Sequence, residues 1–293
     1  MPYMLCQVFL LLLTAEYAYP FTSLALSAKR SECLSASSAK DLPKIEVVKT
    51  MPDPLPKYLK NDYYLLRHGQ STANVAGIIS SSRNLAYSKK HGLTPLGYQQ
   101  GIEASGKLIE LLKESDKQKV LFVSSPFARA LETAEACLKG LSVKKEDLSE
   151  FEIDTDIKVN DDLMERYFGK LDGEALYTYS YVWPVDKFNV THTAFDVESV
   201  AAVSTRLRKV IMQMEDDFEL CNVVLVSHAD VLQICQLYGA GAENVGIFSS
   251  FRFGNGEVRK MERTVESLPP PNPLEPPFRG TITEMPKKEK ASS

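Results

Sequence analysis

The sequence has 293 residues, of which 44% are hydrophobic and 25% are charged, and its formal net charge at pH 7 is −4. This balance is typical of a globular protein with a sizeable core. It excludes a general attraction to nucleic acid or to an anionic membrane, so a site for an anion must be a local concentration of positive charge. The five cysteines form no Cys-x-x-Cys pair, which argues against a disulfide framework or a zinc site.

The first 60 residues are predicted to be a targeting or disordered N-terminal segment. Residues 5–13 form an apolar run that is too short to cross a bilayer but long enough for the apolar part of a secretory signal. Residues 22–40 are rich in serine and alanine and contain a single acid, Glu32, which is typical of an organelle transit segment. We therefore expect a plastid or secretory destination, with the cytoplasm as the alternative if the segment is only disordered.

Residues 61–264 are predicted to form one domain in which strands and helices alternate. Apolar runs at 63–66, 120–123 and 223–226 are bounded by polar residues, as strands covered on both faces are. Thr94 and Pro95 are typical of a helix start, so a helix is expected through residue 112. A second helix is expected to open at Ser125 and Pro126 and run through residue 138, and a third has an apolar stripe over residues 200–214.

This alternation predicts an α/β fold, a three-layer α/β/α sandwich with a mostly parallel central sheet. After this domain, residues 265–293 are rich in proline and end in several lysines, so they are predicted to be a disordered tail.

Charged side chains follow three of the predicted strands. Arg67 and His68 come directly after the first strand, Arg129 lies on the first helical turn after the second, and His228 follows the third. Because the carboxyl ends of parallel strands meet at the same edge of a sheet, we expect these side chains to lie together. Two arginines, two histidines and the N-termini of helices would suit a dianion such as a phosphate group.

Five segments of the chain, in the same order, resemble the histidine phosphatase superfamily in its phosphoglycerate mutase-like branch. They are residues 66–74 (Leu-Arg-His-Gly-Gln-Ser-Thr-Ala-Asn), 91–97 (His-Gly-Leu-Thr-Pro-Leu-Gly), 124–134 (Ser-Ser-Pro-Phe-Ala-Arg-Ala-Leu-Glu-Thr-Ala), 163–169 (Leu-Met-Glu-Arg-Tyr-Phe-Gly) and 226–228 (Val-Ser-His). The resemblance covers about residues 61–260 and implies the phosphoglycerate mutase-like version of the fold.

The resemblance implies catalytic roles for the residues at the strand ends. His68 would be the nucleophile, whose imidazole attacks phosphorus and forms a phosphohistidine. Arg67, Arg129 and His228 would bind the phosphoryl oxygens and stabilise the charge that develops during transfer. No metal or other cofactor is expected, because these side chains already supply the positive charge that the phosphate needs.

The resemblance also implies roles for residues outside the strand ends. Glu165 would protonate the leaving group and then activate water, although a surface salt bridge between Glu165 and Arg166 is an alternative interpretation. Asn74 matches a family position that donates a hydrogen bond to the same phosphate, and Arg166 is a further candidate for binding the substrate. His91 and His192 have no motif partner and are interpreted as surface residues.

The favoured function is hydrolysis of small phosphate monoesters, with sugar or glycerate phosphates as candidates. One alternative is a 2,3-bisphosphoglycerate-dependent phosphoglycerate mutase, but Ala73 and Phe168 stand where the mutases have tryptophan and tyrosine. Another is a catalytically inactive scaffold that binds phosphorylated ligands. The expected partner is a small phosphate ester, neither nucleic acid nor stable membrane insertion is expected, and no feature of the sequence specifies an oligomeric state.

Overall fold

The computed structural model describes residues 49–272, which contain a six-stranded sheet with the order β3-β2-β5-β1-β6, while β4 also pairs with β2. Its long strands are β1 (Asp62–Arg67), β2 (Lys119–Ser124) and β5 (Cys221–Ser227). Shorter strands are β3 (Glu152–Ile153), β4 (Lys158–Val159) and β6 (Val258–Lys260). Only the β1–β6 pairing is antiparallel within the described residues, so the predicted, mostly parallel sheet is confirmed.

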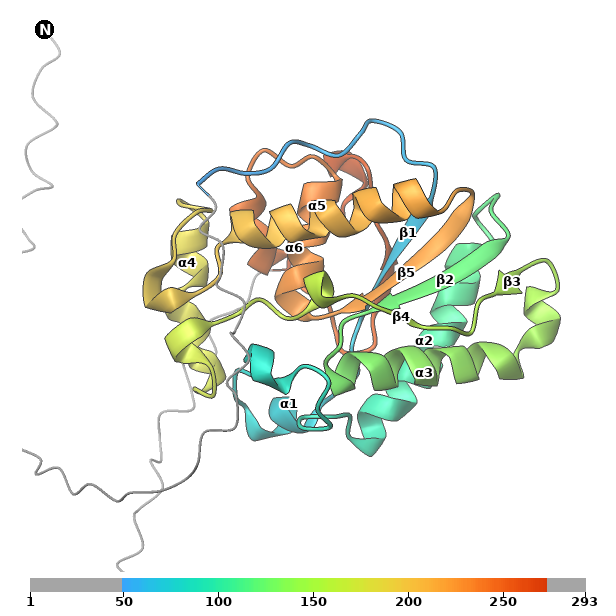
Figure 1. Cartoon of the computed structure of the whole chain (residues 1–293), viewed down its shortest axis with the longest axis horizontal. Coiled ribbons are helices and arrows are strands. Elements are labelled where there is room, and N and C mark those ends of the chain that lie inside the picture. The colour runs from blue at the N-terminus through green and yellow to red at the C-terminus, as the bar shows by residue number, and fades with distance from the viewer. Residues whose placement is uncertain (1–48, 273–293) are drawn as a thin grey trace, which may run out of the picture. The chain divides into compact units, whose positions relative to one another are not determined.

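Helices cover both faces of the sheet, as Figure 1 shows. One face packs against α2 (Pro95–Leu112) and α3 (Ala128–Val143), and the other packs against α5 (Val200–Asp217) and α6 (Ala229–Gly239). Two shorter helices, α1 (Thr72–Ala76) and α4 (Trp183–Asp186), lie in the connections. The predicted three-layer α/β/α sandwich is therefore confirmed.

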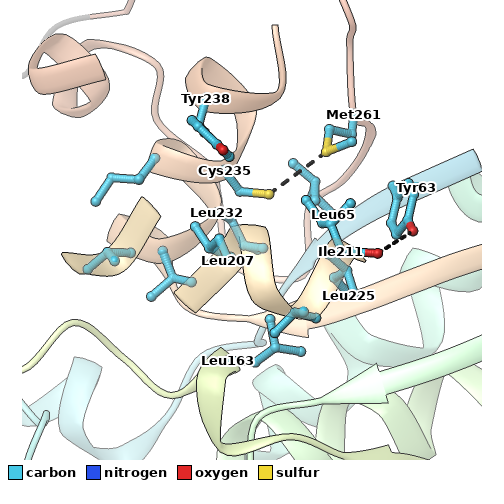
Figure 2. Packing of buried hydrophobic residues seen from close by; sticks show 14 of the residues in the cluster. Tyr63, Leu65, Leu163, Leu207, Ile211, Leu225, Leu232, Cys235, Tyr238 and Met261 are labelled. Atoms are coloured by element: carbon cyan, nitrogen blue, oxygen red, sulfur yellow. Dashed lines mark hydrogen bonds between the residues drawn. The ribbon is translucent and has the colours of Figure 1, made fainter. Parts of the chain in front are cut away.

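The alternation of side chains along each strand builds two separate cores. Along β1, Tyr63 and Leu65 enter the core formed with α5 and α6, whereas Tyr64 and Leu66 enter the core formed with α2 and α3. Figure 2 shows the first of these cores, in which the Tyr63 hydroxyl donates to the backbone carbonyl of Ile211 at 3.2 Å. Because both faces are buried, the three long strands contain continuous apolar runs, which is why the sequence revealed them.

The predicted helix start is confirmed for α2 and differs for α3. The hydroxyl of Thr94 accepts from the amide of Gly97 at 3.1 Å and begins α2 as predicted. Helix α3 begins at Ala128 with Phe127 as its N-cap, two residues later than the predicted opening at Ser125 and Pro126. The physical reason is that the hydroxyl of Ser125 contacts His228 instead of serving as the helix cap.

Residues just outside both predicted boundaries of the domain also pack against it. Residues 49–60 were expected to belong to the N-terminal segment, but Leu55 is buried and the carbonyl of Asp53 accepts hydrogen bonds from Tyr238 and Arg208. At the other end, the amide of Asn272 donates to Ser250 at 2.6 Å.

The apolar run, the transit-like stretch and most of the proline-rich tail lie outside the described residues, as does the basis for the predicted localisation. None of the helices within 49–272 is both long and apolar enough to cross a membrane.

Candidate active site

The ends of β1, β2 and β5 bring three of the predicted residues into direct contact. Strands β1 and β5 pair in a register that sets Arg67 opposite Ser227, so His68 and His228 leave the sheet at the same level. Arg129, which β2 delivers through the start of α3, donates its Nε–H to both Nε2 of His68 and Nδ1 of His228, each at 3.2 Å. The two imidazole rings lie 5.2 Å apart between centroids. The predicted meeting of these side chains is therefore seen in the structure.

The hydrogen bonds of His68 define which of its nitrogens carries the proton. Its Nδ1 lies 2.7 Å from the backbone carbonyl of Gly69, which can only accept, so Nδ1 is the protonated nitrogen. Burial, followed by the nearby charges of Arg129 and Arg67, holds the pKa of His68 well below its ordinary value. The imidazole is therefore neutral near pH 7, with the lone pair of Nε2 directed into the site.

His228 is neutral for the same reasons but is protonated on the other nitrogen. Its Nδ1 accepts from Arg129, so Nε2 carries the proton and donates to the hydroxyl of Ser125 at 2.9 Å. Burial and then the charge of Arg129 lower the pKa of His228 well below its ordinary value. In this tautomer His228 adds no positive charge to the site, and Ser125 holds its one N–H.

The two arginines are held differently. The Nη2 of Arg129 donates to the carbonyl of Ser80 at 2.8 Å, and its guanidinium lies 4.7 Å from the ring centroid of Phe127. Burial lowers the pKa of Arg129 to about 10, so it stays charged near neutrality. Arg67 donates through Nη1 to the carbonyl of Phe253 at 2.6 Å, but its buried Nε has no partner among the described residues. A buried cationic N–H without an acceptor is costly, and an anion would supply that acceptor.

The loop after β1 is held in place by very close backbone packing. A Cβ atom on Gly69 would lie 2.2 Å from the carbonyl oxygen of Gly97, and one on Gly97 would lie 2.0 Å from that of Gln70. The amide of Gly69 also donates to the hydroxyl of Thr133 in α3 at 3.0 Å. The glycine of segment 91–97 and the threonine of segment 124–134 thus support the loop that carries His68.

Asn74 is oriented by its side-chain oxygen. This oxygen accepts from the amide and the hydroxyl of Ser71, at 3.0 and 3.1 Å, and from the side chain of Asn255 at 3.3 Å. Within residues 49–272 no group accepts a hydrogen bond from the side-chain nitrogen of Asn74. That nitrogen is therefore available as a neutral donor to a ligand.

Glu165 lies in the connection after β4 and is close to His228. Its side chain is only 11% exposed, and Oε2 lies 3.9 Å from Nδ1 of His228. Burial, followed by the negative charge of Asp230, raises the pKa of Glu165 to about 7, although Arg129 and Arg67 oppose this. The carboxyl group is therefore placed to hold a proton near neutrality and to release it readily.

The position of Arg166 corrects two expectations. Its guanidinium is completely buried and pairs through both Nη atoms with the two oxygens of Asp186, each at 2.8 Å, rather than with Glu165. Its Nε donates to the carbonyl of Glu198 at 2.7 Å. The alternative of a surface salt bridge with Glu165 is wrong. The predicted substrate contact would require this buried guanidinium to leave partners that it already contacts through Nε and both Nη atoms.

His91 and His192 are not the free surface residues that the sequence suggested. His91 lies 2.7 Å from the hydroxyl of Ser80, whose backbone carbonyl in turn holds Arg129. His192 has a side chain that is only 7% exposed, with Nε2 2.7 Å from Asp186. Both therefore contact residues that support the candidate site.

Three residues around Glu165 were not predicted from the sequence, and this part of the candidate site is called the Glu165 side. Tyr179 stacks on Trp183 at 4.4 Å between ring centroids, and Trp183 donates its indole N–H to Asp230 at 3.1 Å. Burial and then the negative charges of Glu165 and Asp230 raise the pKa of Tyr179 well above its ordinary value. Asp230 could have been noticed because it lies two residues after His228. The two aromatic residues lie in an irregular segment whose periodicity gave no signal.

The arrangement has a positive part and an acid part. Arg67 and Arg129 supply fixed positive charge beside two neutral imidazoles, and Glu165 supplies a weakly acidic proton. Among residues 49–272 there is no group of three or more histidine, cysteine, aspartate or glutamate side chains that could hold a metal ion. Such a site can bind a phosphoryl group and offer both a nucleophile and a proton donor to it.

Two arginines and two histidines at the carboxyl edge of a three-layer α/β sandwich suit an enzyme that acts on phosphate groups. The family model of the histidine phosphatase superfamily (branch 1) matches residues 63–267, and the chain belongs to this superfamily. It is accordingly a phosphoric monoester hydrolase.

Individual relatives agree with this assignment. The adenosylcobalamin/alpha-ribazole phosphatase of Salmonella typhimurium is 30% identical over 179 residues, which cover 58% of this chain and 75% of that protein. A solved mycobacterial glucosyl-3-phosphoglycerate phosphatase in complex with VO3 has a TM-score of 0.51 and 20% identity, covering 67% of this chain and 90% of its own. The product of an open reading frame from Mycobacterium tuberculosis has a TM-score of 0.51 and 21% identity, covering 68% and 89%. The two structures show a shared fold.

Proposed function

We propose that this chain hydrolyses small phosphate monoesters in two steps, through a phosphohistidine on His68. The observation that carries the proposal is the contact geometry of His68. Its Nδ1–H is fixed on the Gly69 carbonyl, so Nε2 carries the lone pair that would attack, and this lone pair accepts the Nε–H that Arg129 shares with His228. The catalytic domain corresponds to residues 61–264, and part of the segment before residue 61 packs against it. The preceding segment would direct the protein to a plastid or the secretory route, and the end of the chain would be a passive tail.

In the first step, Nε2 of His68 attacks phosphorus while the bond from phosphorus to the leaving oxygen breaks. Glu165 gives its proton to that oxygen, so the leaving group departs as a neutral alcohol. Arg129 and the unpaired Nε–H of Arg67 stabilise the charge on the phosphoryl oxygens. Asn74 adds a neutral donor to the same group, and His228 does so in the tautomer that carries its proton on Nδ1, with the Ser125 hydroxyl then donating to Nε2.

In the second step, the carboxylate of Glu165 accepts a proton from water, and the water oxygen attacks phosphorus. The bond between phosphorus and Nε2 of His68 breaks, which releases phosphate and restores both residues. A pKa of about 7 suits a carboxyl group that must act first as an acid and then as a base at neutral pH.

Two positions favour hydrolysis over the mutase alternative. Phe168 has no hydroxyl group to offer a substrate, and its ring is completely buried among Ile79, Leu171, Val182 and Val197. Ala73 is also buried, on α1, and offers no indole. A mutase must protect its phosphohistidine from water until the substrate takes the phosphoryl group back. The phosphatase named among the relatives supports the same choice, and sugar or glycerate phosphates remain the substrates that we propose.

The test uses the full chain with a panel of sugar phosphates and glycerate phosphates. We expect steady release of phosphate, and enzyme quenched in acid during turnover of a labelled substrate should carry label that is labile to acid and stable to alkali. A second reaction contains 3-phosphoglycerate with a trace of 2,3-bisphosphoglycerate. Rapid isomerisation with negligible phosphate release would establish the mutase, and binding without either reaction would establish the inactive scaffold.

A further inference from the structure

A buried cluster of charges lies beside Glu165 and has no part in the reaction as proposed. Arg166 pairs with both oxygens of Asp186 at 2.8 Å, and its Nη1 also lies 3.5 Å from Asp230. All three side chains are almost completely buried, with exposures of 4% or less. Asp230 gains a further hydrogen bond from the indole N–H of Trp183 at 3.1 Å.

The charges in this cluster do not balance at Asp230. One guanidinium faces two carboxylates, and the bidentate pair with Asp186 already uses its best geometry. His192 contacts Asp186 and not Asp230, so it does not compensate the negative charge of Asp230. The negative charge of Asp230 is therefore only partly compensated, in a region without solvent to screen it.

We propose that Asp230 is a positioning residue for the acid step, because its partly compensated negative charge keeps a proton on the neighbouring Glu165. This inference rests on the proposed function, in which Glu165 must hold a proton when the substrate binds. Asp230 is held by the first turn of α6, which begins directly after His228, so the same strand end fixes both groups. The side chains of Arg166 and Trp183 contact the carboxylate of Asp230, whereas Glu165 accepts the backbone N–H of Arg166 at 2.9 Å, so the two acids have different partners.

The direction of the titrations agrees with this arrangement. Burial raises the pKa of Asp230, while the charge of Arg166 and the indole hydrogen bond lower it again. The pKa of Glu165 is raised by burial and next by Asp230 itself. The two acids therefore influence each other, and a negative charge on Asp230 favours the protonated form of Glu165.

Several other charged or titratable groups face Glu165 from the surrounding elements. They are Arg67 after β1, Arg83 in the 3-10 helix Arg83–Leu85, Arg129 on α3, Tyr179 in the 3-10 helix Leu176–Tyr181, and His228 before α6. The arginines favour the ionised form of Glu165. A negative charge at Asp230 opposes the arginines and favours the protonated form of Glu165. Without that charge, Glu165 should lose its proton at lower pH.

The test is the pH dependence of kcat/KM in Asp230→Asn, measured in the full chain between about pH 5 and 9 with glycerol phosphate and with p-nitrophenyl phosphate. For glycerol phosphate, we expect the fall at alkaline pH to move about one unit toward lower pH, with roughly a tenfold loss at pH 8. The p-nitrophenyl ester should show little change, because its leaving group barely needs a proton. Asp216→Asn, an exposed change of the same kind on α5, is the matched control and should leave both profiles unchanged.

Two outcomes would overturn the inference. One is an Asp230→Asn enzyme that turns over glycerol phosphate with an unmoved alkaline limb, and the other is an equal shift for both substrates. If that variant does not fold, the carboxyl carbon of Glu165 can be titrated by NMR in the wild-type chain, with Glu165→Gln to assign the signal. A Glu165 already ionised at pH 6 would contradict the inference. The proposed function is judged separately by phosphohistidine labelling, which none of these outcomes alters.

Discussion

The two sides of the candidate site show how the same burial produces opposite chemistry. At the strand ends, burial next to Arg129 and Arg67 lowers the pKa of His68, so a nucleophile is kept neutral. In the connection that carries Glu165, burial next to a negative charge raises the pKa of the carboxyl group, so an acid is kept protonated. Titratable groups whose environments push their pKa values apart mark the division of roles in an enzyme. The difference between the two sides predicts different consequences for mutations on each.

The two sides also differ in how they are built. The strand-end side depends on backbone contacts that tolerate no added atom, such as that between Gly69 and Gly97. The Glu165 side depends on buried ion pairs between arginines and carboxylates, including the contacts of Glu198 with Arg83 and Arg206. Buried pairs of this kind offer little net stability but are costly to break, so they fix a connection that has almost no regular secondary structure.

The largest expected effect is that of His68→Ala, which should remove essentially all turnover and all acid-labile label. The reason is that the variant lacks the nitrogen on which the proposed phosphohistidine forms. His91→Ala is the matched control, because His91 reaches the site only through Ser80 and should cost no more than about tenfold. Phosphate release and labelling should be measured together, and substantial turnover by the His68 variant would refute the nucleophile assignment.

The next effect tests the acid side. Glu165→Gln should slow kcat/KM for alkyl phosphates by about 10²–10⁴-fold, the usual contribution of a general acid. The fall of the wild-type profile above pH 7 should disappear with it, because the group that loses its proton there is gone. For p-nitrophenyl phosphate the loss should be much smaller. Glu110→Gln, an exposed change on α2, should leave both rates unchanged. Equal losses on both substrates would show that Glu165 is not the proton donor.

A smaller loss is expected from Arg129→Lys, which keeps the positive charge but removes the planar fork. A lysine cannot reach both imidazoles and the carbonyl of Ser80 as the Nε and Nη atoms of Arg129 do. We expect kcat/KM to fall about 10²–10³-fold, as when one donor to a developing charge is lost. Arg208→Lys, on the outer side of α5, serves as the control. A variant with near-normal activity would mean that charge alone, without shape, is sufficient at this position.

The strand-end side was predictable from the sequence, whereas most of the Glu165 side was not. Apolar runs locate β1, β2 and β5, and the rule that parallel strands end at one edge brings His68, Arg129 and His228 together without further information. The connection that carries Glu165 has no periodicity, so nothing in the sequence shows that Arg166 turns inward to Asp186, twenty residues away. The fold determines which residues form a buried ion pair. A neighbour in sequence, such as Glu165, therefore need not be the partner of Arg166.

The smallest effect on catalysis, and the sharpest separation of the two sides, is expected from Arg166→Gln. This change leaves the carboxylates of Asp186 and Asp230 buried without their cation, which should destabilise the protein by about 3–5 kcal/mol. Because the guanidinium is completely buried and pairs with protein groups through Nε and both Nη atoms, we expect no contact with the substrate, so KM should stay within a few-fold of wild type in protein that remains folded. Unfolding in urea and steady-state kinetics at low temperature separate these quantities. A large rise in KM with unchanged stability would place Arg166 in the substrate site after all, and would require the ion pair with Asp186 to open when the substrate binds.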